Sequence, residues 1–238
     1  TEEKHLLWHF NNPFNSGLSG KLTSVVATNR SGVILGFLGA VSTELYAQGK
    51  KIPSIWLANW ITKKEIQGKG VGTGILKEMS KHRLLFAASM SRMAYPLYLK
   101  RGFIVLGKYS RLMYINNPER TFSLIRLLHP KEVISNLDSK KFAPKKFFPS
   151  NSENIKIEWN KKFDEKEWNE AWIAIRKRFG ATIDRTSKYI CWRFIDHPYI
   201  KYHIGVARML NGHVVGLAVI RIETTSAGDG FSIARVVD

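Results

Sequence analysis

The sequence predicts an α/β fold in which strands and amphipathic helices alternate along the chain. An apolar run over residues 55–61 is typical of a buried strand, and a helix-like pattern follows it after a glycine-rich turn. A Trp-x-Phe segment followed by a strand, a turn and a second strand occurs twice. The dipeptide Asn211-Gly212 lies between alternating apolar runs, which indicates a β-hairpin.

The repeated order of elements suggests two related segments. Each copy places Trp-x-Phe before a Pro-aromatic pair, a strand, a glycine turn and another strand, beginning at Trp8 and at Trp192. Two glycines four residues apart mark both copies: Gly32 with Gly36, and Gly212 with Gly216. Two unrelated helix–hairpin units would give a similar short match, so that alternative stays open.

The repeat sets the expected domain boundaries. A predicted strand at residues 154–159 and a predicted helix at 165–179 precede Trp192, whereas nothing equivalent precedes Trp8. Asp238 matches Asn59, to within a residue, just before the glycine-rich turn. We expect a first unit over 1–116 that lacks its opening strand and helix, a helical and basic linker over 117–150, and a second unit over 151–238. The chain is thereby expected to be a piece of a longer protein.

The glycine-rich turn has the features of a phosphate cradle. Glycines carry no Cβ, so consecutive amides can turn toward an anion, and the first turn of the following helix adds unpaired N–H groups and a positive dipole end. The residues of the cradle are Gln67, Gly68, Lys69, Gly70, Val71 and Gly72. In the helix, one face is predicted to be buried and carries Val71, Ile75, Leu76, Met79 and Arg83, while Lys77, Glu78 and Lys81 lie opposite.

Spacing excludes two better-known phosphate loops. The dinucleotide fingerprint would need glycine at Thr73 or Ile75, and the nucleoside-triphosphate loop would need Ser or Thr after Lys69, where Gly70 stands. The pattern Gln-x-x-Gly-x-Gly resembles instead the pyrophosphate-binding signature of the GNAT acyltransferase superfamily. That resemblance implies a mixed, mostly antiparallel sheet flanked by helices, and acetyl-CoA or another acyl-CoA as co-substrate. The alternative is a glycine-rich turn that only caps a helix.

A second segment, residues 91–103, carries the same resemblance. In GNAT proteins a short helix places a tyrosine four residues before a Gly-Phe pair, and Tyr98 precedes Gly102-Phe103 in this way. The resemblance implies that Tyr98 lies near the CoA sulfur and acts as general acid. Ser91 stands where the family commonly has asparagine, which weakens the expected polar contact to the cofactor. Without the family, Tyr98 would be read as a core aromatic.

The resemblance also implies the remaining site residues. Backbone groups of the strand before the cradle are expected to bind the acyl and pantetheine oxygens, and the cradle is expected to bind the pyrophosphate. The expected cofactor-binding residues are Trp60, Ile61, Thr62, Gln67, Gly68, Lys69, Gly70, Val71, Gly72, Thr73 and Ser91. Glu44, at the expected end of the strand from Gly36, is the candidate general base, although an exposed strand-end carboxylate explains it equally simply.

The composition of the chain limits which partners, cofactors and compartments are expected. The net charge of +18 favours polyanions in general, but no nucleic-acid-binding motif is present, so nucleic acid is not the expected partner. No apolar run is long enough to cross a bilayer. Cys191 is the only cysteine, which fits a reducing cytoplasm and a buried small hydrophobe. His5 and His9 share a spacing of four without a third ligand, so no metal is expected.

The predicted function is acyl-CoA-dependent N-acyl transfer, most simply acetyl transfer, to a small amine. The repeat resembles bacterial tandem-GNAT proteins, a group associated with surface polysaccharide and its amino-sugar precursors. A Fem-like transferase using aminoacyl-tRNA is the first alternative, which the charge favours and the intact cradle disfavours. A non-catalytic CoA-binding scaffold is the second, suggested by Asn59 and Ser91.

Overall fold

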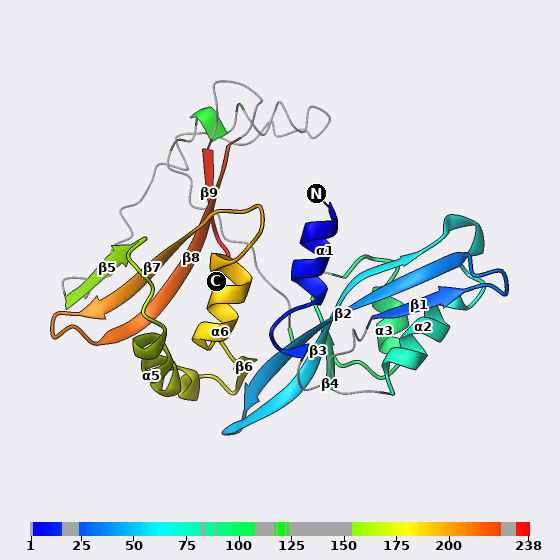
Figure 1. The fold of residues 1–238 in the computed structure, drawn as a ribbon, viewed down its shortest axis with the longest axis horizontal. Helices are drawn as coiled ribbons and strands as arrows, with labels where there is room; N and C mark the ends of the chain where they lie inside the picture. Colours follow the sequence, from blue (N-terminus) through cyan, green and yellow to red (C-terminus); the bar gives the residue numbers. More distant parts are fainter. Residues whose placement is uncertain are drawn as a thin grey trace. The chain divides into compact units, whose positions relative to one another are not determined.

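A computed structural model describes residues 2–15, 24–81, 84–88, 90–107, 117, 119–121, 123, 154–224 and 232–238 (Figure 1). The chain forms two compact units. Unit 1 comprises Thr1–Val105 and Lys162–Lys201, and unit 2 comprises Leu106–Lys161 and Tyr202–Asp238. Lys162–Lys201, which the repeat assigned to the second segment, therefore packs within unit 1. Most of the expected linker over 117–150, including the helix-like stretch 121–128, lies outside the described residues, as does Arg83.

The sheet of unit 1 is mixed but mostly antiparallel. Its strands follow the order β1-β2-β3-β4, with β6 also pairing with β2 (Figure 1). Only β3 and β4 run parallel among these pairs. The strands are β1 (Val25–Thr28), β2 (Ile34–Ala47), β3 (Lys50–Thr62), β4 (Leu84–Ala87) and β6 (Ala181–Ile183). The predicted strand over 55–61 is thus the second half of β3, and the mostly antiparallel sheet is confirmed.

Helices cover both faces of this sheet. On one face α2 (Val71–Met79) buries Ile75, Leu76 and Met79 against β2 and β3, with Lys77 and Glu78 exposed, which confirms the predicted amphipathic pattern. On the other face α1 (Glu2–Phe10) packs against β2. The other helical elements of unit 1 are η2 (Lys64–Ile66), α3 (Tyr95–Lys100), α5 (Glu165–Ile175), η5 (Arg176–Arg178), α6 (Ser187–Ile190) and the π-helix η6 (Cys191–Ile195).

Close approach of α1 to the sheet requires glycine at position 39. A Cβ there would lie 2.5 Å from Phe10 Cε1 and 2.8 Å from the carbonyl oxygen of Ala58. We expect Gly39→Ala to lower the free energy of unfolding by about 1–3 kcal/mol, because backbone and a packed ring must both move. Urea denaturation measures this, with Gly180→Ala as control, since nothing lies within 4 Å of a Cβ at Gly180. Equal stability of the two variants would contradict the close approach.

Two tryptophans join α1 to η6 by reciprocal hydrogen bonds. Trp8 Nε1 donates to the carbonyl of Trp192 at 2.9 Å, and Trp192 Nε1 donates to the carbonyl of Trp8 at 3.0 Å. The indole rings stack with centroids 5.5 Å apart. The two Trp-x-Phe segments that the sequence pattern paired therefore contact each other directly in unit 1.

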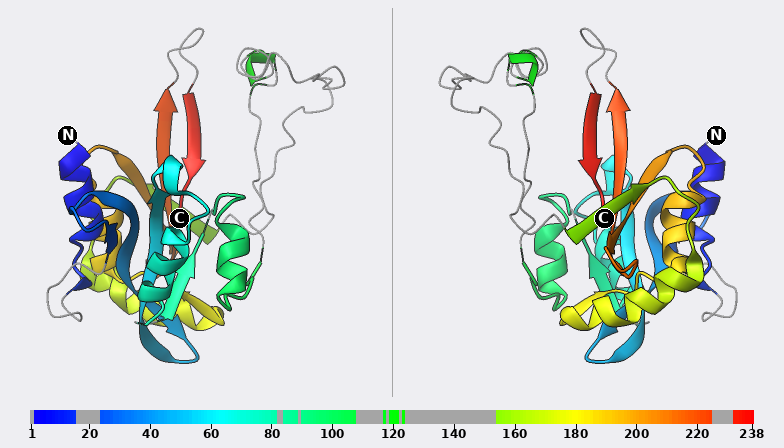
Figure 2. Two further views of the ribbon diagram at one scale, coloured as in Figure 1. Left: turned by 90° about the vertical axis from the view of Figure 1, so that its right-hand side faces the viewer. Right: turned by 90° about the vertical axis from the view of Figure 1, so that its left-hand side faces the viewer.

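Unit 2 contains an antiparallel four-stranded sheet in the order β5-β7-β8-β9 (Figure 2). Its strands are β5 (Ile155–Trp159), β7 (Tyr202–Met209), β8 (Val214–Thr224) and β9 (Ser232–Val236). The predicted strands at 154–159 and 202–207 and the hairpin at Asn211-Gly212 are all present. β9 continues the antiparallel pairing of the hairpin.

The β1–β2 and β7–β8 hairpins have the same internal geometry. Ala27 pairs with Gly36 and Ala207 with Gly216, and in both cases the register shifts immediately afterwards. Each turn contains a glycine of positive φ, Gly32 at +78° and Gly212 at +86°, whose amide donates to the residue three positions earlier. Equivalent positions differ by 180 residues throughout. The likeness seen in the sequence thus extends to register, turn and bulge.

Candidate functional site

The cradle is an open backbone turn at the start of α2. Gly68 and Gly70 have φ of +80° and +84°, a region in which side-chain-bearing residues are strained. Nothing lies within 4 Å of a Cβ placed at either glycine. Gly70 is the residue before the helix, and Lys69 is exposed. Among the described residues, no side chain therefore closes over these two glycines.

Amide donors point out of the helix at this turn. The first intrahelical bond of α2 runs from Gly74 N to Gly70 O at 2.9 Å, so the amides of residues 71–73 lack an intrahelical acceptor. They carry the positive end of the helix dipole. Gln67 Nε2 donates to Thr62 O at 3.4 Å, which ties the cradle to the end of β3. The predicted residues 67–73 thus form one continuous turn that ends in outward-facing helix amides, a geometry that suits an anion.

β3 and β4 pair only over part of the length of β3. The parallel register covers residues 54–57 of β3 and 84–87 of β4, whereas β3 continues to Thr62. Within the described residues, β3 beyond Leu57 has no partner on its β4 side. Trp60, Ile61 and Thr62 belong to this part of β3, which extends beyond the last residue of β4.

A bulge at Asn59 reverses the faces of β3. Phe37 pairs with Ile61 but Gly39 pairs with Ala58, so β3 has one extra residue opposite Leu38, and Asn59 has a φ of +53°. Ile55 and Leu57 face α2 before the bulge, and Trp60 packs on the same core cluster after it, while Ile61 is 63% exposed. Simple alternation would have placed Trp60 on the opposite face. The sequence offered only Asn59, a residue that tolerates positive φ, as a signal.

Tyr98 lies in an aromatic row beside the cradle. It is only 4% exposed and belongs to the core cluster with Ile75 and Leu76. Its ring meets that of Trp60 at 5.2 Å and that of Phe103 at 4.9 Å, both edge to face. Burial raises the pKa of Tyr98 to about 12. The hydroxyl therefore stays protonated at neutral pH, which a proton or hydrogen-bond donor requires.

Ser91 organises the segment that leads into α3. Its Oγ accepts from the backbone amide of Ala94 at 3.2 Å, and its carbonyl accepts from Ala94 and Tyr95. The side chain thereby stabilises the turn before Tyr98. Its oxygen retains a lone pair for a further donor.

Glu44 is not brought to this cluster. The expectation that the strand ends at Glu44 is wrong, because β2 continues to Ala47 through its pairing with β3 and β6. Glu44 pairs with Pro53, seven residues before Trp60 on β3, which corresponds to about 20 Å along the strand. Its carboxylate lies 3.6 Å from Lys51 Nζ. In this position it has an ion-pairing role beside β6.

Sequence reasoning missed a buried carboxylate next to Glu44. Asp184, which follows β6, has a fully buried side chain that contacts Lys51 Nζ at 2.8 Å, Arg176 Nη1 at 3.3 Å and Trp172 Nε1 at 2.6 Å. Burial alone would raise its pKa, but the hydrogen bonds from Lys51 and Trp172 and the two cationic charges lower it. No local sequence pattern identifies Asp184 as buried, because its partners Lys51, Trp172 and Arg176 come from β3, α5 and the start of η5.

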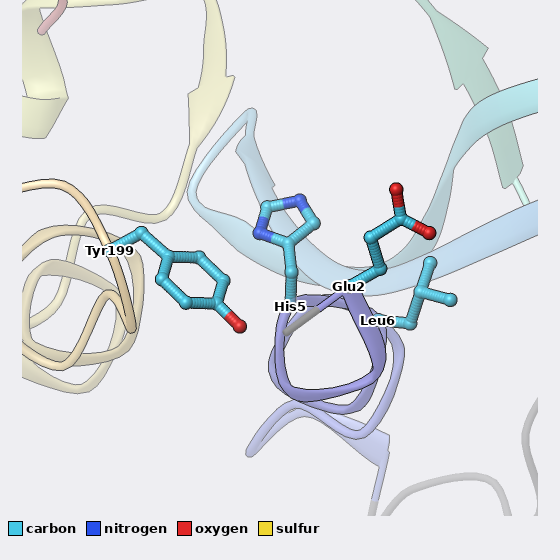
Figure 3. A pocket seen from close by; sticks show the side chains of 4 residues that line it. All are labelled: Glu2, His5, Leu6 and Tyr199. Carbon is cyan, nitrogen blue, oxygen red and sulfur yellow. The ribbon is translucent and has the colours of Figure 1, made fainter.

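A second side-chain cluster surrounds α1. His5 stacks on His9 with centroids 5.9 Å apart and lies 5.7 Å from His197, and a hollow of about 540 Å³ is lined by Glu2, His5, Leu6 and Tyr199 (Figure 3). Burial, followed by the charge of Arg193, lowers the pKa of His9 to about 4. His9 is therefore neutral at pH 7. Neither the cradle nor Tyr98 lines this hollow.

Thiol and metal chemistry find no support in the described part of the chain. Burial and the nearby carboxylates of Glu165 and Asp196 raise the pKa of Cys191 to about 11, so it remains a thiol rather than a nucleophilic thiolate. Among the described residues, no three His, Cys, Asp or Glu side chains are grouped to hold a metal ion.

None of the described helices has both the length and the apolar character needed to cross a membrane.

Comparison with solved structures finds this fold in N-acyltransferases. N-myristoyltransferase of Saccharomyces cerevisiae, solved with myristoyl-CoA and inhibitors, matches at 12% identity and a TM-score of 0.53, covering 98% of this chain. A conserved protein of Enterococcus faecalis described as a probable N-acyltransferase matches at 13% identity and a TM-score of 0.51, covering 92%. No family model and no curated protein matches the sequence. The chain therefore shares the fold of these two structures.

The chain spans about half the length of these two structures, 54% and 52% respectively. At such low identity the likeness concerns the backbone arrangement alone. The roles of individual side chains must be argued from their own geometry.

Proposed function

We propose that this protein is an acyl-CoA-dependent N-acyltransferase that acts on a small amine, with acetyl-CoA as the simplest donor. The observation that carries the proposal is the open cradle at residues 67–73, which follows the β3 segment whose Trp60 packs against buried Tyr98. A diphosphate matches the cradle in charge, since amides and the positive end of a helix dipole face the space above it. The fold comparison supports the same class of co-substrate.

The cradle, the β3 backbone and Tyr98 would each have a different role in acyl transfer. The cradle amides of residues 71–73 would hold the diphosphate, and the β3 backbone at Trp60, Ile61 and Thr62 would bind the pantetheine and acyl oxygens. A backbone donor aimed at the developing oxyanion contributes about 3 kcal/mol of transition-state stabilisation. Tyr98 would donate to the sulfur as the thioester bond breaks. The attacking amine must lose a proton, and we assign that step to water because Glu44 lies elsewhere.

Binding of acetyl-CoA tests the proposal directly. Isothermal titration calorimetry with the 238-residue chain is expected to show one saturable site for acetyl-CoA and for CoA itself. Binding should weaken with added inorganic pyrophosphate, which competes for the cradle. Absence of heat with both ligands, from protein that has an intact near-ultraviolet circular dichroism spectrum, would refute the proposal.

Tyr98→Phe separates catalysis from binding. We expect the rate of CoA release in the presence of an amine acceptor to fall by about 10² or more, with the Kd for acetyl-CoA unchanged within about threefold. The raised pKa of about 12 also predicts that ionisation of Tyr98 causes no loss of activity between pH 7 and pH 10. A thiol-detecting assay over that range checks both points. A falling limb near pH 10 that disappears in Tyr98→Phe would contradict the raised pKa, and a rate unchanged by Tyr98→Phe would contradict the role of Tyr98 as proton donor.

We further propose that unit 2 derives from a second copy of the same fold. The shared register, turn and bulge of the two hairpins support this proposal. The position of Asp238 also supports it. The carbonyl of Asp238 accepts a hydrogen bond from the amide of Val219 on β8, and in unit 1 the bulge residue Asn59 lies next to the pairing of Ala58 with Gly39 on β2. The tandem arrangement supports an amino-sugar acceptor by its resemblance to bacterial tandem proteins. Salt-sensitive binding of tRNA without binding of CoA would favour the Fem-like alternative, which rests on the charge of +18.

A further inference from the structure

The side chain of Trp60 occupies the space next to the proposed acyl-transfer site. After the Asn59 bulge this residue faces α2, in the part of β3 that has no described partner on its β4 side. A Cβ on Gly72 would lie 3.3 Å from Cζ2 and 3.5 Å from Nε1 of Trp60. The indole therefore packs directly under the first turn of α2.

Two further rings extend this packing away from the cradle. Trp60 meets Tyr98 at 5.2 Å, and Tyr98 meets Phe103 at 4.9 Å, so three aromatic side chains fill the region between β3, α2 and α3. Trp60 and Phe103 pack against the core cluster that contains Tyr98. A chain of methylenes entering this region would have to displace an indole that is held on two sides. Close-packed interiors resist such displacement.

We propose that Trp60 limits the donor to short acyl groups, so that this protein uses acetyl-CoA or a similarly short thioester rather than a long-chain fatty acyl-CoA. This inference rests on the proposed function, because it concerns the acyl group of the same site. A thioester sulfur bound beside Tyr98 would place the acyl group next to the indole, so a longer acyl chain would meet the aromatic row. The donor class thereby differs from that of the yeast enzyme, which was solved with myristoyl-CoA.

Three substitutions at two tryptophans of β3 test the proposal. Trp60→Ala removes the indole, and Trp60→Phe is the conservative variant in case the alanine variant folds poorly. Trp56→Ala is the matched control, because Trp56 lies four residues earlier on β3 and stacks on Phe86 at 6.1 Å rather than on Tyr98. Calorimetry would measure the Kd for CoA, acetyl-CoA and octanoyl-CoA with each folded protein.

We expect the wild-type chain to bind octanoyl-CoA about tenfold or more weakly than acetyl-CoA, and Trp60→Ala to abolish or reverse that preference. Trp60→Phe should give an intermediate ratio, and Trp56→Ala should keep the wild-type ratio. The Kd for CoA without an acyl group is the reference in every variant, and the acetyl-CoA and octanoyl-CoA affinities are each divided by it. These ratios report the acyl group alone, since the cradle contacts are common to all three ligands.

Other outcomes would overturn the proposal in distinguishable ways. Tighter binding of octanoyl-CoA than acetyl-CoA by the wild-type chain, or a ratio unchanged in both Trp60 variants, would refute the acyl-length limit while leaving the proposed function standing. A ratio that changes equally in Trp56→Ala would show a general packing effect and refute the role of Trp60. Failure of the wild-type chain to bind any of the three ligands would refute the proposed function and the inference together.

Discussion

Asp184→Ala is expected to lower the free energy of unfolding by about 3–5 kcal/mol, the largest stability effect predicted for this chain. The carboxylate is buried and contacts Lys51, Arg176 and Trp172, which belong to β3, the start of η5 and α5. Removing it leaves a cation and an indole N–H without their acceptor in a desolvated position. Urea denaturation followed by tryptophan fluorescence would measure the loss.

Dependence on pH gives this prediction a second test. The pKa of Asp184 is lowered in the folded state, so its contribution is present above the unfolded-state pKa of about 4 and is lost as the pH falls below that value. The stability difference between wild type and Asp184→Asn should therefore shrink from pH 6 toward pH 3. Glu78→Ala, which breaks an exposed pair with Lys81, is the control and should cost less than about 1 kcal/mol. A difference that stays constant with pH would mean that the carboxylate charge is not what matters.

Gly70→Val is expected to weaken the binding of acetyl-CoA by about 100-fold or more. A β-branched residue at a φ of +84° must either strain the backbone by about 1–2 kcal/mol or move out of the left-handed region, and movement would turn the cradle amides away from the diphosphate. The new side chain would also project into space that is empty of protein atoms. Calorimetry below the unfolding temperature of the variant separates lost binding from lost folding.

Gly74→Ala is the matched control for that substitution. Gly74 lies one turn further along α2, has no positive φ, and a Cβ added to it would have nothing within 4 Å. Alanine should therefore stabilise the helix by about 0.5–1 kcal/mol and leave the Kd within about twofold. Comparable loss of binding in both variants would show that the helix as a whole, and not the turn at Gly70, governs recognition.

Local patterns in the sequence were sufficient for most elements of the fold. The period of Ile75, Leu76 and Met79 set the buried face of α2, and Asn211-Gly212 set a hairpin, because both signals depend on neighbours in the chain. The cradle was predictable for the same reason. The expected role of the β3 backbone beside the cradle, by contrast, came from the family resemblance and not from the residues alone.

What the sequence could not supply depends on contacts between distant segments. Asp184 is buried because residues 51, 172 and 176 meet around it, and although Trp172 and Arg176 have the i,i+4 spacing of one helix face, no spacing connects them to Lys51. The face on which Trp60 lies depends on one extra residue opposite Leu38, which strict alternation does not anticipate. Glu44 was misplaced at a strand end because the pairing of β2 with β6 extends the strand to Ala47.

The pairing of β6 with β2 has a practical consequence for dissecting this protein. Leu45, Tyr46 and Ala47 form a ladder with residues 181–183, and Asp184 N donates to the carbonyl of Glu44 at 2.8 Å. A polypeptide of residues 1–105 alone would leave that edge of β2 bare and Lys51 without its buried counter-ion, which invites edge-to-edge aggregation. The half that carries the cradle is therefore completed by sequence more than a hundred residues away, and any attempt to study it in isolation must carry residues 162–201 along.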